Sequence, residues 1–101
     1  MRVAVFGQMR FPPEQRAAIL PHLKTLIEAT RRNDGCIAYD VAEDVLDPGL
    51  FRFSELWPDQ ETLSGHMKAP HIPPWREACL TCGIIERTFA VYDATNERGL
   101  G

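Results

Sequence analysis

Two ionisable side chains of different chemistry lie close together in the middle of the chain, each among apolar neighbours. Glu55 belongs to the run Phe51–Trp57, whose period of two places it on the same strand face as three aromatic residues. His66 follows nine positions after Trp57, on the apolar side of a short helix that the Pro58-Asp59 break predicts. A carboxylate on such a face must be paired or hydrogen-bonded, and an imidazole exchanges protons near neutral pH. The two residues therefore predict a small-molecule pocket lined by aromatic side chains.

Length and composition limit the class of protein. With 101 residues, of which 45% are hydrophobic and 25% charged, the chain is typical of one globular domain with one core. A net charge of −3 and 11 scattered basic residues argue against nucleic acid or a membrane as a partner. No apolar run approaches the roughly 20 residues that cross a bilayer, and no signal-peptide pattern occurs. We expect a single cytoplasmic domain over residues 1–101, ordered over about 2–93, with a tail at 94–101.

The three cysteines are an odd number, which argues against a complete disulfide framework. Cys79 and Cys82 have CxxC spacing, but no second ligand pair stands at the distance that a zinc site needs. A thioredoxin-type pair belongs at a helix start, whereas this pair falls at the end of an expected helix. We expect Cys79 and Cys82 to be core residues that bind no zinc and form no essential disulfide.

The pattern of apolar residues predicts four strands and two helical regions. We expect a kink or a late start at Pro21 in the first helix, and a break at the prolines of positions 70–74 between two helical pieces. The expected elements are a strand at Arg2–Met9, a helix at Glu14–Arg32, strands at Cys36–Val45 and Leu50–Trp57, a short helix after Asp59, a helix at Trp75–Thr81 and a strand at Ile84–Tyr92. The order β-α-β-β-α-β predicts an α+β, ferredoxin-like antiparallel sheet with its helices on one face.

The second face of such a sheet has no helices to cover it. Both sides of the second and fourth expected strands carry apolar residues, so the pattern leaves open which side faces the helices. A sheet that is apolar on both faces needs a partner for its uncovered face. We expect a homodimer in which two sheets pack face to face.

Three short motifs, taken in order, resemble the antibiotic biosynthesis monooxygenase (ABM) family. They are Gly-Cys-x-x-Tyr at 35–39, Glu-x-Trp at 55–57 and His-x-x-x-x-His at 66–71, and the resemblance runs from Val3 to about Tyr92. The chain departs from the family at Asp34, where Pro is frequent, and at Pro21. The resemblance implies a dimeric α/β barrel. In characterised members it also implies oxygenation of phenolic or quinol-like substrates by dioxygen, without metal, flavin or haem.

These residues fit such chemistry, because an electron-rich phenolate can itself pass an electron to dioxygen. His66 is the expected proton acceptor, Glu55 would orient it or bond a strand neighbour, and Tyr39 would donate to the substrate oxygen. No two-His, one-carboxylate metal set and no Rossmann glycine motif is evident, so we expect no cofactor and no metal. The expected substrate-binding residues are Phe6, Phe53, Trp57, His71 and Trp75.

Other roles remain open for the same residues. Glu55 could tie its strand to Arg76 or Arg87, His66 could bond a backbone carbonyl, and the tryptophans could be core residues. A non-catalytic dimeric protein that binds an aromatic ligand, or acts in a stress response, is the second functional hypothesis. Haem degradation on the same fold is weaker, because no Asn-Trp-His set matches.

Overall fold

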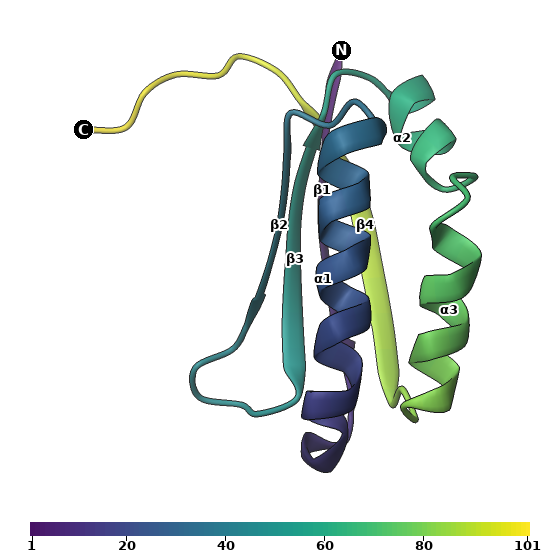
Figure 1. The fold of residues 1–101 in the computed structure, drawn as a ribbon. Helices are drawn as coiled ribbons and strands as arrows, with labels where there is room; N and C mark the ends of the chain where they lie inside the picture. The colour runs from purple at the N-terminus through teal and green to yellow at the C-terminus, as the bar shows by residue number, and fades with distance from the viewer.

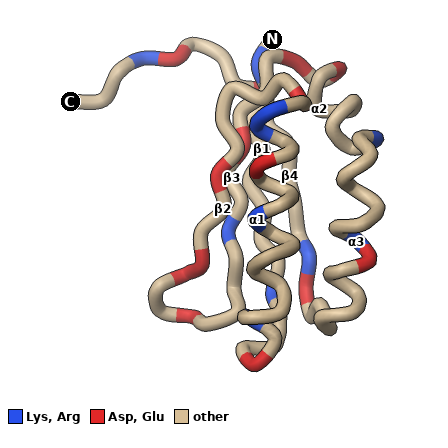
Figure 2. Tube along the Cα trace, viewed as in Figure 1, with Lys and Arg blue, Asp and Glu red and all other residues tan.

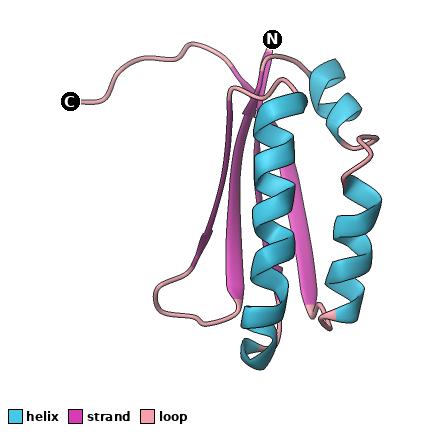
Figure 3. Ribbon diagram, in the orientation of Figure 1, coloured by secondary structure: helices cyan, strands magenta, loops and turns pink.

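The structure is a computed structural model that describes residues 1–101. Its elements in chain order are β1 (Arg2–Arg10), a short 3-10 helix (Pro13–Gln15), α1 (Arg16–Asn33), β2 (Ala38–Glu43), β3 (Leu50–Trp57), α2 (Gln60–His66), α3 (Ile72–Thr81) and β4 (Glu86–Ala94). The strands form one antiparallel sheet in the order β2-β3-β1-β4. All three α-helices lie over the same face of that sheet (Figure 1, Figure 3). The expected α+β, ferredoxin-like fold is confirmed. No helix is both long and apolar enough to span a membrane.

The register of the strands shows which side chains face the helices. Glu55 of β3 lies opposite Val5 of β1 and Tyr39 of β2, so these three residues form one row across the sheet. All three are buried, and so are the neighbouring aromatic residues Phe53 and Trp57. The alternation of side chains along each strand then places every second residue on this helix-facing side. The sequence pattern left this assignment open.

Two helices contain prolines at positions where a helix end was expected, and their boundaries differ from the expected ones for this reason. Helix α3 begins at Ile72 rather than Trp75, with Pro73 and Pro74 in its first turn. A missing N–H costs nothing there, because the first N–H groups of a helix have no partner within it. Helix α1 begins at Arg16 and continues through Pro21, so the expected late start at that proline is wrong.

The two edge strands also differ from their expected ranges. Strand β2 ends at Glu43, because Asp44 begins the connecting turn and its carboxylate accepts the N–H of Leu46 at 2.8 Å. Strand β4 begins at Glu86, two residues later than expected, and continues to Ala94. Its only neighbour is β1, and most of its side chains are exposed.

The sheet face away from the helices is divided into a polar and an apolar half. At one end, Arg52 bonds both Asp44 and Gln8. Toward the other end, the rings of Phe6 and Tyr92 lie 5.9 Å apart, and each residue is more than half exposed. Phe6 therefore lies on the opposite side of the sheet from the helices. The expectation that it forms a pocket wall is corrected by its position on β1, one residue from the helix-facing Val5.

A glycine in β1 determines how an aromatic ring lies on the helix-facing side. Gly7 is paired with Phe89 of β4, and a Cβ atom at position 7 would overlap the Phe89 ring. The ring therefore rests directly on the backbone of β1. It also packs edge-on against Phe53, with 5.1 Å between ring centroids.

We expect Gly7→Ala to push the Phe89 ring away from the sheet and to lower the free energy of unfolding by about 1–3 kcal/mol, a typical cost of overpacking. Chemical denaturation measures the loss. In a Phe89→Ala background the same change at position 7 should cost much less, since no ring is there to be displaced. Additive effects of the two substitutions would contradict this contact.

Candidate functional site

A cavity of about 790 Å³ lies between the sheet and helices α2 and α3. Val5, Phe53 and Phe89 of the sheet contribute to one wall, while Leu63 of α2 and Trp75 of α3 contribute to the other. Most of the lining is apolar, which is typical of a small-molecule site with a few polar groups for orientation. The cavity has the size of a pocket for a drug-sized or polycyclic ligand.

Five of the eight residues expected at the site from the sequence line this cavity. They are Tyr39, Phe53, Glu55, His66 and Trp75. The other three lie elsewhere: Phe6 is on the far side of the sheet, Trp57 is fully buried in the core, and His71 stands behind the cavity wall. The aromatic lining therefore comes from Tyr39, Phe53, Trp75 and Phe89, and Phe89 was not among the expected residues.

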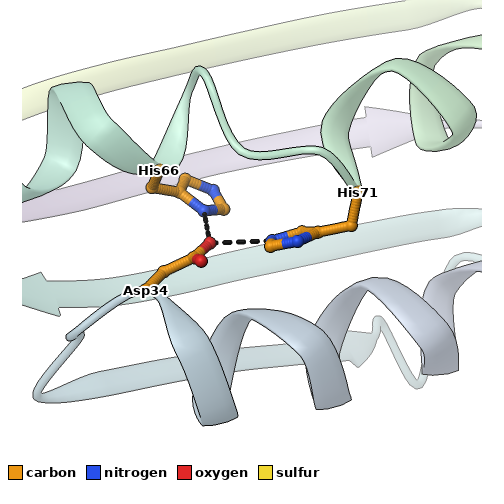
Figure 4. A group of neighbouring side chains, drawn as sticks. All are labelled: Asp34, His66 and His71. Carbon is orange, nitrogen blue, oxygen red and sulfur yellow. Dashed lines mark hydrogen bonds and ion pairs between the residues drawn. The ribbon is translucent and has the colours of Figure 1, made fainter.

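His66 belongs to a buried group of three polar side chains, shown in Figure 4. Its Nδ1 lies 2.6 Å from Oδ2 of Asp34, and Nε2 of His71 lies 2.8 Å from the same oxygen. The side chains of His66 and Asp34 are only 5% and 6% exposed. Asp34 comes from the end of α1, His66 from the end of α2 and His71 from the residue before α3. One carboxylate thus connects all three helices.

These contacts determine which nitrogen of His66 carries the proton. A carboxylate accepts hydrogen bonds, so Nδ1 of His66 must donate its N–H to Asp34. In the neutral imidazole the lone pair then lies on Nε2, and His66 lines the cavity. Burial lowers the pKa of His66, although the Asp34 carboxylate opposes the shift. His66 is therefore a neutral base at neutral pH, and its proton-accepting atom is Nε2.

Asp34 is a buried residue of the candidate site that the sequence analysis did not single out. It stands at the end of α1, where its N–H bonds the carbonyl of Thr30 at 3.1 Å, and the sequence indicated only a helix stop there. The available signal was its position: it replaces a frequent Pro beside the Gly-Cys-x-x-Tyr motif. A carboxylate directly before that motif is unexpected unless it has a partner.

The same three residues offer the donor atoms of a metal site. Their nitrogen and oxygen atoms lie within 4.8 Å of one another, so the expectation that no two-His, one-carboxylate set exists is wrong. Their separations of 2.6 and 2.8 Å, however, are those of hydrogen bonds. Zinc-type bonds of about 2.1 Å at angles of 90° or more hold ligand atoms roughly 3 Å or more apart. A metal would therefore require the three side chains to move apart by several tenths of an ångström.

Glu55 bonds a neighbour on its own strand, which is one of the roles expected for it. Its Oε1 accepts the indole N–H of Trp57 at 2.9 Å, two residues along the same strand. It forms no ion pair with Arg76 or Arg87 and does not bond His66, whose carboxylate partner is Asp34. Burial raises the pKa of Glu55 above its ordinary value. Among the open alternatives, the strand-neighbour role is the one the geometry supports.

Tyr39 stands between the aromatic core and His66. Its ring packs edge-on against the imidazole, with 5.5 Å between centroids, and against Phe53 and Trp57 at 6.4 Å each. Burial raises the pKa of its hydroxyl. The hydroxyl stays protonated at neutral pH and can donate a hydrogen bond into the cavity that Tyr39 lines.

The two closely spaced cysteines are buried, as expected of core residues. Cys79 lies in the last turns of α3 and Cys82 directly follows that helix, and neither forms a disulfide. Burial raises the pKa of Cys79 to about 11. Although this thiol lines the cavity, it is therefore protonated at neutral pH and is a poor nucleophile.

The family model described as antibiotic biosynthesis monooxygenase (ABM) matches residues 2–78. The chain belongs to this family. The match includes the Gly-Cys-x-x-Tyr, Glu-x-Trp and His-x-x-x-x-His motifs, so all three residues of the Asp34 group lie within the family domain. At this level the comparisons support an oxidoreductase of the monooxygenase type.

Individual ABM relatives agree with this assignment. The chain is 32% identical over 74 residues to a Mycobacterium tuberculosis protein named "Putative monooxygenase", with 73% of this chain and 72% of that protein covered. An uncharacterized Synechocystis protein is 29% identical over 69 residues, which span 68% of this chain but only 47% of that protein. A Deinococcus radiodurans structure described as an antibiotic biosynthesis monooxygenase, also labelled putative, superposes with a TM-score of 0.91 at 25% identity, covering 98% of both chains.

Two substitutions at Glu55 should separate its charge from its hydrogen bond. Glu55→Ala leaves the buried indole N–H of Trp57 without a partner, which should cost about 1–3 kcal/mol of unfolding free energy. Glu55→Gln keeps an acceptor oxygen and removes the charge, so it should be at least as stable as the original chain at pH 7. Denaturant titrations of the three proteins measure both effects.

The pH dependence of the free energy of unfolding of the same variants tests the direction in which the pKa of Glu55 is shifted. The pKa of Glu55 is raised above its ordinary 4.5, so its favourable contribution is complete below pH 4.5 and is lost as pH rises through the folded-state pKa. The stability of Glu55→Gln relative to the original chain should therefore increase as pH rises above about 4.5. A constant difference across this range would contradict the buried-carboxylate assignment.

Proposed function

We propose that this ABM protein is a cofactor-independent monooxygenase that oxygenates a quinol or polycyclic phenol with dioxygen as co-substrate. The observation that carries the proposal is His66, a neutral base with Nε2 free, in the wall of an apolar, aromatic-lined cavity. A phenol bound there would give its proton to Nε2. The resulting phenolate is electron-rich enough to reduce dioxygen, so the substrate itself supplies the electrons.

The overall reaction balances without an added reductant. A quinol and dioxygen give a hydroxylated quinone and water: one oxygen atom enters the ring, the other leaves as water, and the substrate loses four electrons. The protein must accept the first proton and then return a proton to the reduced oxygen. A single base that alternates between its neutral and charged forms meets both needs.

Asp34 and Tyr39 have supporting roles in this scheme. When Nε2 accepts a proton, the imidazolium stays hydrogen-bonded to the Asp34 carboxylate, which stabilises the new charge and keeps the ring in place. The protonated Tyr39 hydroxyl would donate to the phenolate oxygen. Glu55 has no direct part, because its carboxylate is bonded to Trp57.

The proposed assembly is a homodimer formed by the sheet face away from the helices. The exposed rings of Phe6 and Tyr92 lie on that face, and nothing within the chain covers them. The cavity opens on the opposite side of the sheet, so dimerisation would leave it accessible.

Light scattering at micromolar concentration should return twice the 11.4 kDa mass of the chain. Phe6→Asp should shift the protein toward the monomer, since a charge would enter the apolar half of the interface. Exchanging the similarly exposed Leu80 on the helix side for Asp is the matched control and should leave the mass unchanged. A monomeric parent chain would contradict the proposed dimer.

For activity, oxygen uptake should be measured with a panel of quinols and polycyclic phenols. We expect His66→Ala to slow turnover by on the order of 10²–10⁴-fold, the usual contribution of a general acid–base group. Asp34→Asn should slow it as well, because the amide can donate to Nδ1 and so favour the tautomer with its proton on Nε2. Nitrogen-15 NMR of the His66 imidazole should show this change of tautomer directly.

Chelators should leave the activity unchanged. A metal bound stoichiometrically by Asp34, His66 and His71, with activity that depends on it, would overturn the cofactor-free scheme. Tight binding of phenols without oxygen uptake would instead support the non-catalytic binding protein. Unfolding of His66→Ala, judged by circular dichroism, would be resolved with His66→Gln, which keeps a polar side chain of similar reach.

A further inference from the structure

A pair of arginines lines the cavity together with the groups already described. Arg87 lies in β4 and Arg76 in α3, both line the cavity, and Figure 2 shows basic residues on both of these elements. Five of the eleven basic side chains form ion pairs on the outer surface, whereas neither of these two has a carboxylate within 4 Å. Two cations without partners in the lining of one apolar cavity call for an anionic ligand group.

The carboxylates that line the cavity have partners other than the two arginines. Glu86 is held by Gln8, whose Nε2 donates to its carboxylate at 2.8 Å. Glu55 is buried beside the indole of Trp57, and burial raises its pKa. His66 is neutral at neutral pH, because burial lowers its pKa. Neither carboxylate forms an ion pair with Arg76 or Arg87, so the N–H donors of both guanidinium groups are free for an anionic ligand group.

Arg87 is exposed, but its guanidinium is held in place by an aromatic ring of the cavity wall. Arg87 and Phe89 are two residues apart in β4, so both side chains lie on the same, helix-facing side of the sheet. The guanidinium carbon stands 4.4 Å from the centroid of the Phe89 ring, which itself rests on Gly7. A stacked guanidinium keeps its N–H edge free for a planar oxyanion, and less side-chain entropy is lost on binding. The positive charge of Arg87 also acts to lower the pKa of Glu55, against the effect of burial.

The register separates this group from the proton-accepting end of the cavity. Val91 of β4 is level with Val5 and Glu55, and Arg87 lies four residues away along the strand, which is about 13 Å. A ligand that reaches both ends must carry its two polar groups on opposite sides of an extended aromatic body.

We propose that Arg87, assisted by Arg76, binds an anionic oxygen substituent of the ligand, and that the preferred ligands are polycyclic phenols with a carboxylate at the end remote from the phenolic hydroxyl. The orientation of the ligand rests on the proposed function, since the hydroxyl end is the one that meets His66. The binding of the anion itself does not depend on turnover.

Calorimetric titrations with three related probes test this assignment. The probes are 6-hydroxy-2-naphthoate, its neutral methyl ester and 2-naphthol, which lacks the second substituent. We expect the carboxylate to bind about 10-fold or more tightly than either neutral probe, a typical effect of a hydrogen bond to a charged group. Raising the salt concentration should weaken the binding of the carboxylate probe but not that of the two neutral probes, because salt screens interactions between charges.

Substitutions then locate the site. Arg87→Gln should remove most of the preference for the carboxylate while leaving the affinity for 2-naphthol unchanged, and Arg87→Lys should retain part of it. Arg76→Gln should have a smaller effect in the same direction. Arg98→Gln in the C-terminal tail is the matched control and should change nothing.

Equal affinities for the carboxylate and its ester, or an equal loss for all three probes in Arg87→Gln, would overturn the proposal. Oxygen uptake is recorded separately with the same compounds. Preferred binding of the carboxylate without uptake would refute the monooxygenase function and leave the anion site intact. Oxygen uptake with these phenols, together with equal affinities for the carboxylate and its ester, would refute the anion site and leave the monooxygenase function intact.

Discussion

The arrangement of the helices depends on one buried oxygen atom. Oδ2 of Asp34 accepts hydrogen bonds from both His66 and His71, and these three residues lie at the ends or starts of three different helices. A carboxylate that is only 6% exposed requires such partners, because an unpaired buried charge costs several kcal/mol. The requirement acts in both directions: the imidazoles hold the carboxylate, and the carboxylate determines the tautomer and orientation of each imidazole. The same two hydrogen bonds therefore help to position the helices and orient the imidazole that lines the cavity.

The fold was predictable because it depends on patterns that repeat over many residues. Alternation in the strands and helical spacing in the Ile19–Leu26 region are local signals, and their order permits few topologies. The side of the sheet that faces the helices was not predictable, since apolar residues occupy both sides of β4 and only pairing with β1 decides between them. Phe6 was misplaced for this reason. The early start of α3 was missed because Pro73 and Pro74 end a helix in most positions but begin one in its first turn.

The candidate site was predictable only in part, for a related physical reason. His66, Tyr39 and Glu55 could be found from the sequence because each is a polar residue on an otherwise apolar face. Asp34 had only its place before the Gly-Cys-x-x-Tyr motif to mark it, because its neighbours in sequence are polar and its partners are 32 and 37 residues away. Glu55 was assigned to the right face, but the sequence could not decide among its possible partners, since the bond to Trp57 depends on two side chains of one strand bending toward each other. Pairwise geometry of this kind leaves no trace in spacing alone.

The parts of the fold that line the cavity differ in how tightly their side chains are packed. The side chains of Asp34, His66 and Tyr39 are buried and packed on every side, so substitutions at these positions are costly. Strand β4, in contrast, is an edge strand with one neighbour and mostly exposed side chains, Val91 being 50% exposed. Substitutions in β4 can therefore change the shape and charge of the cavity wall, while the buried contacts of Asp34 with its two histidines stay as they are.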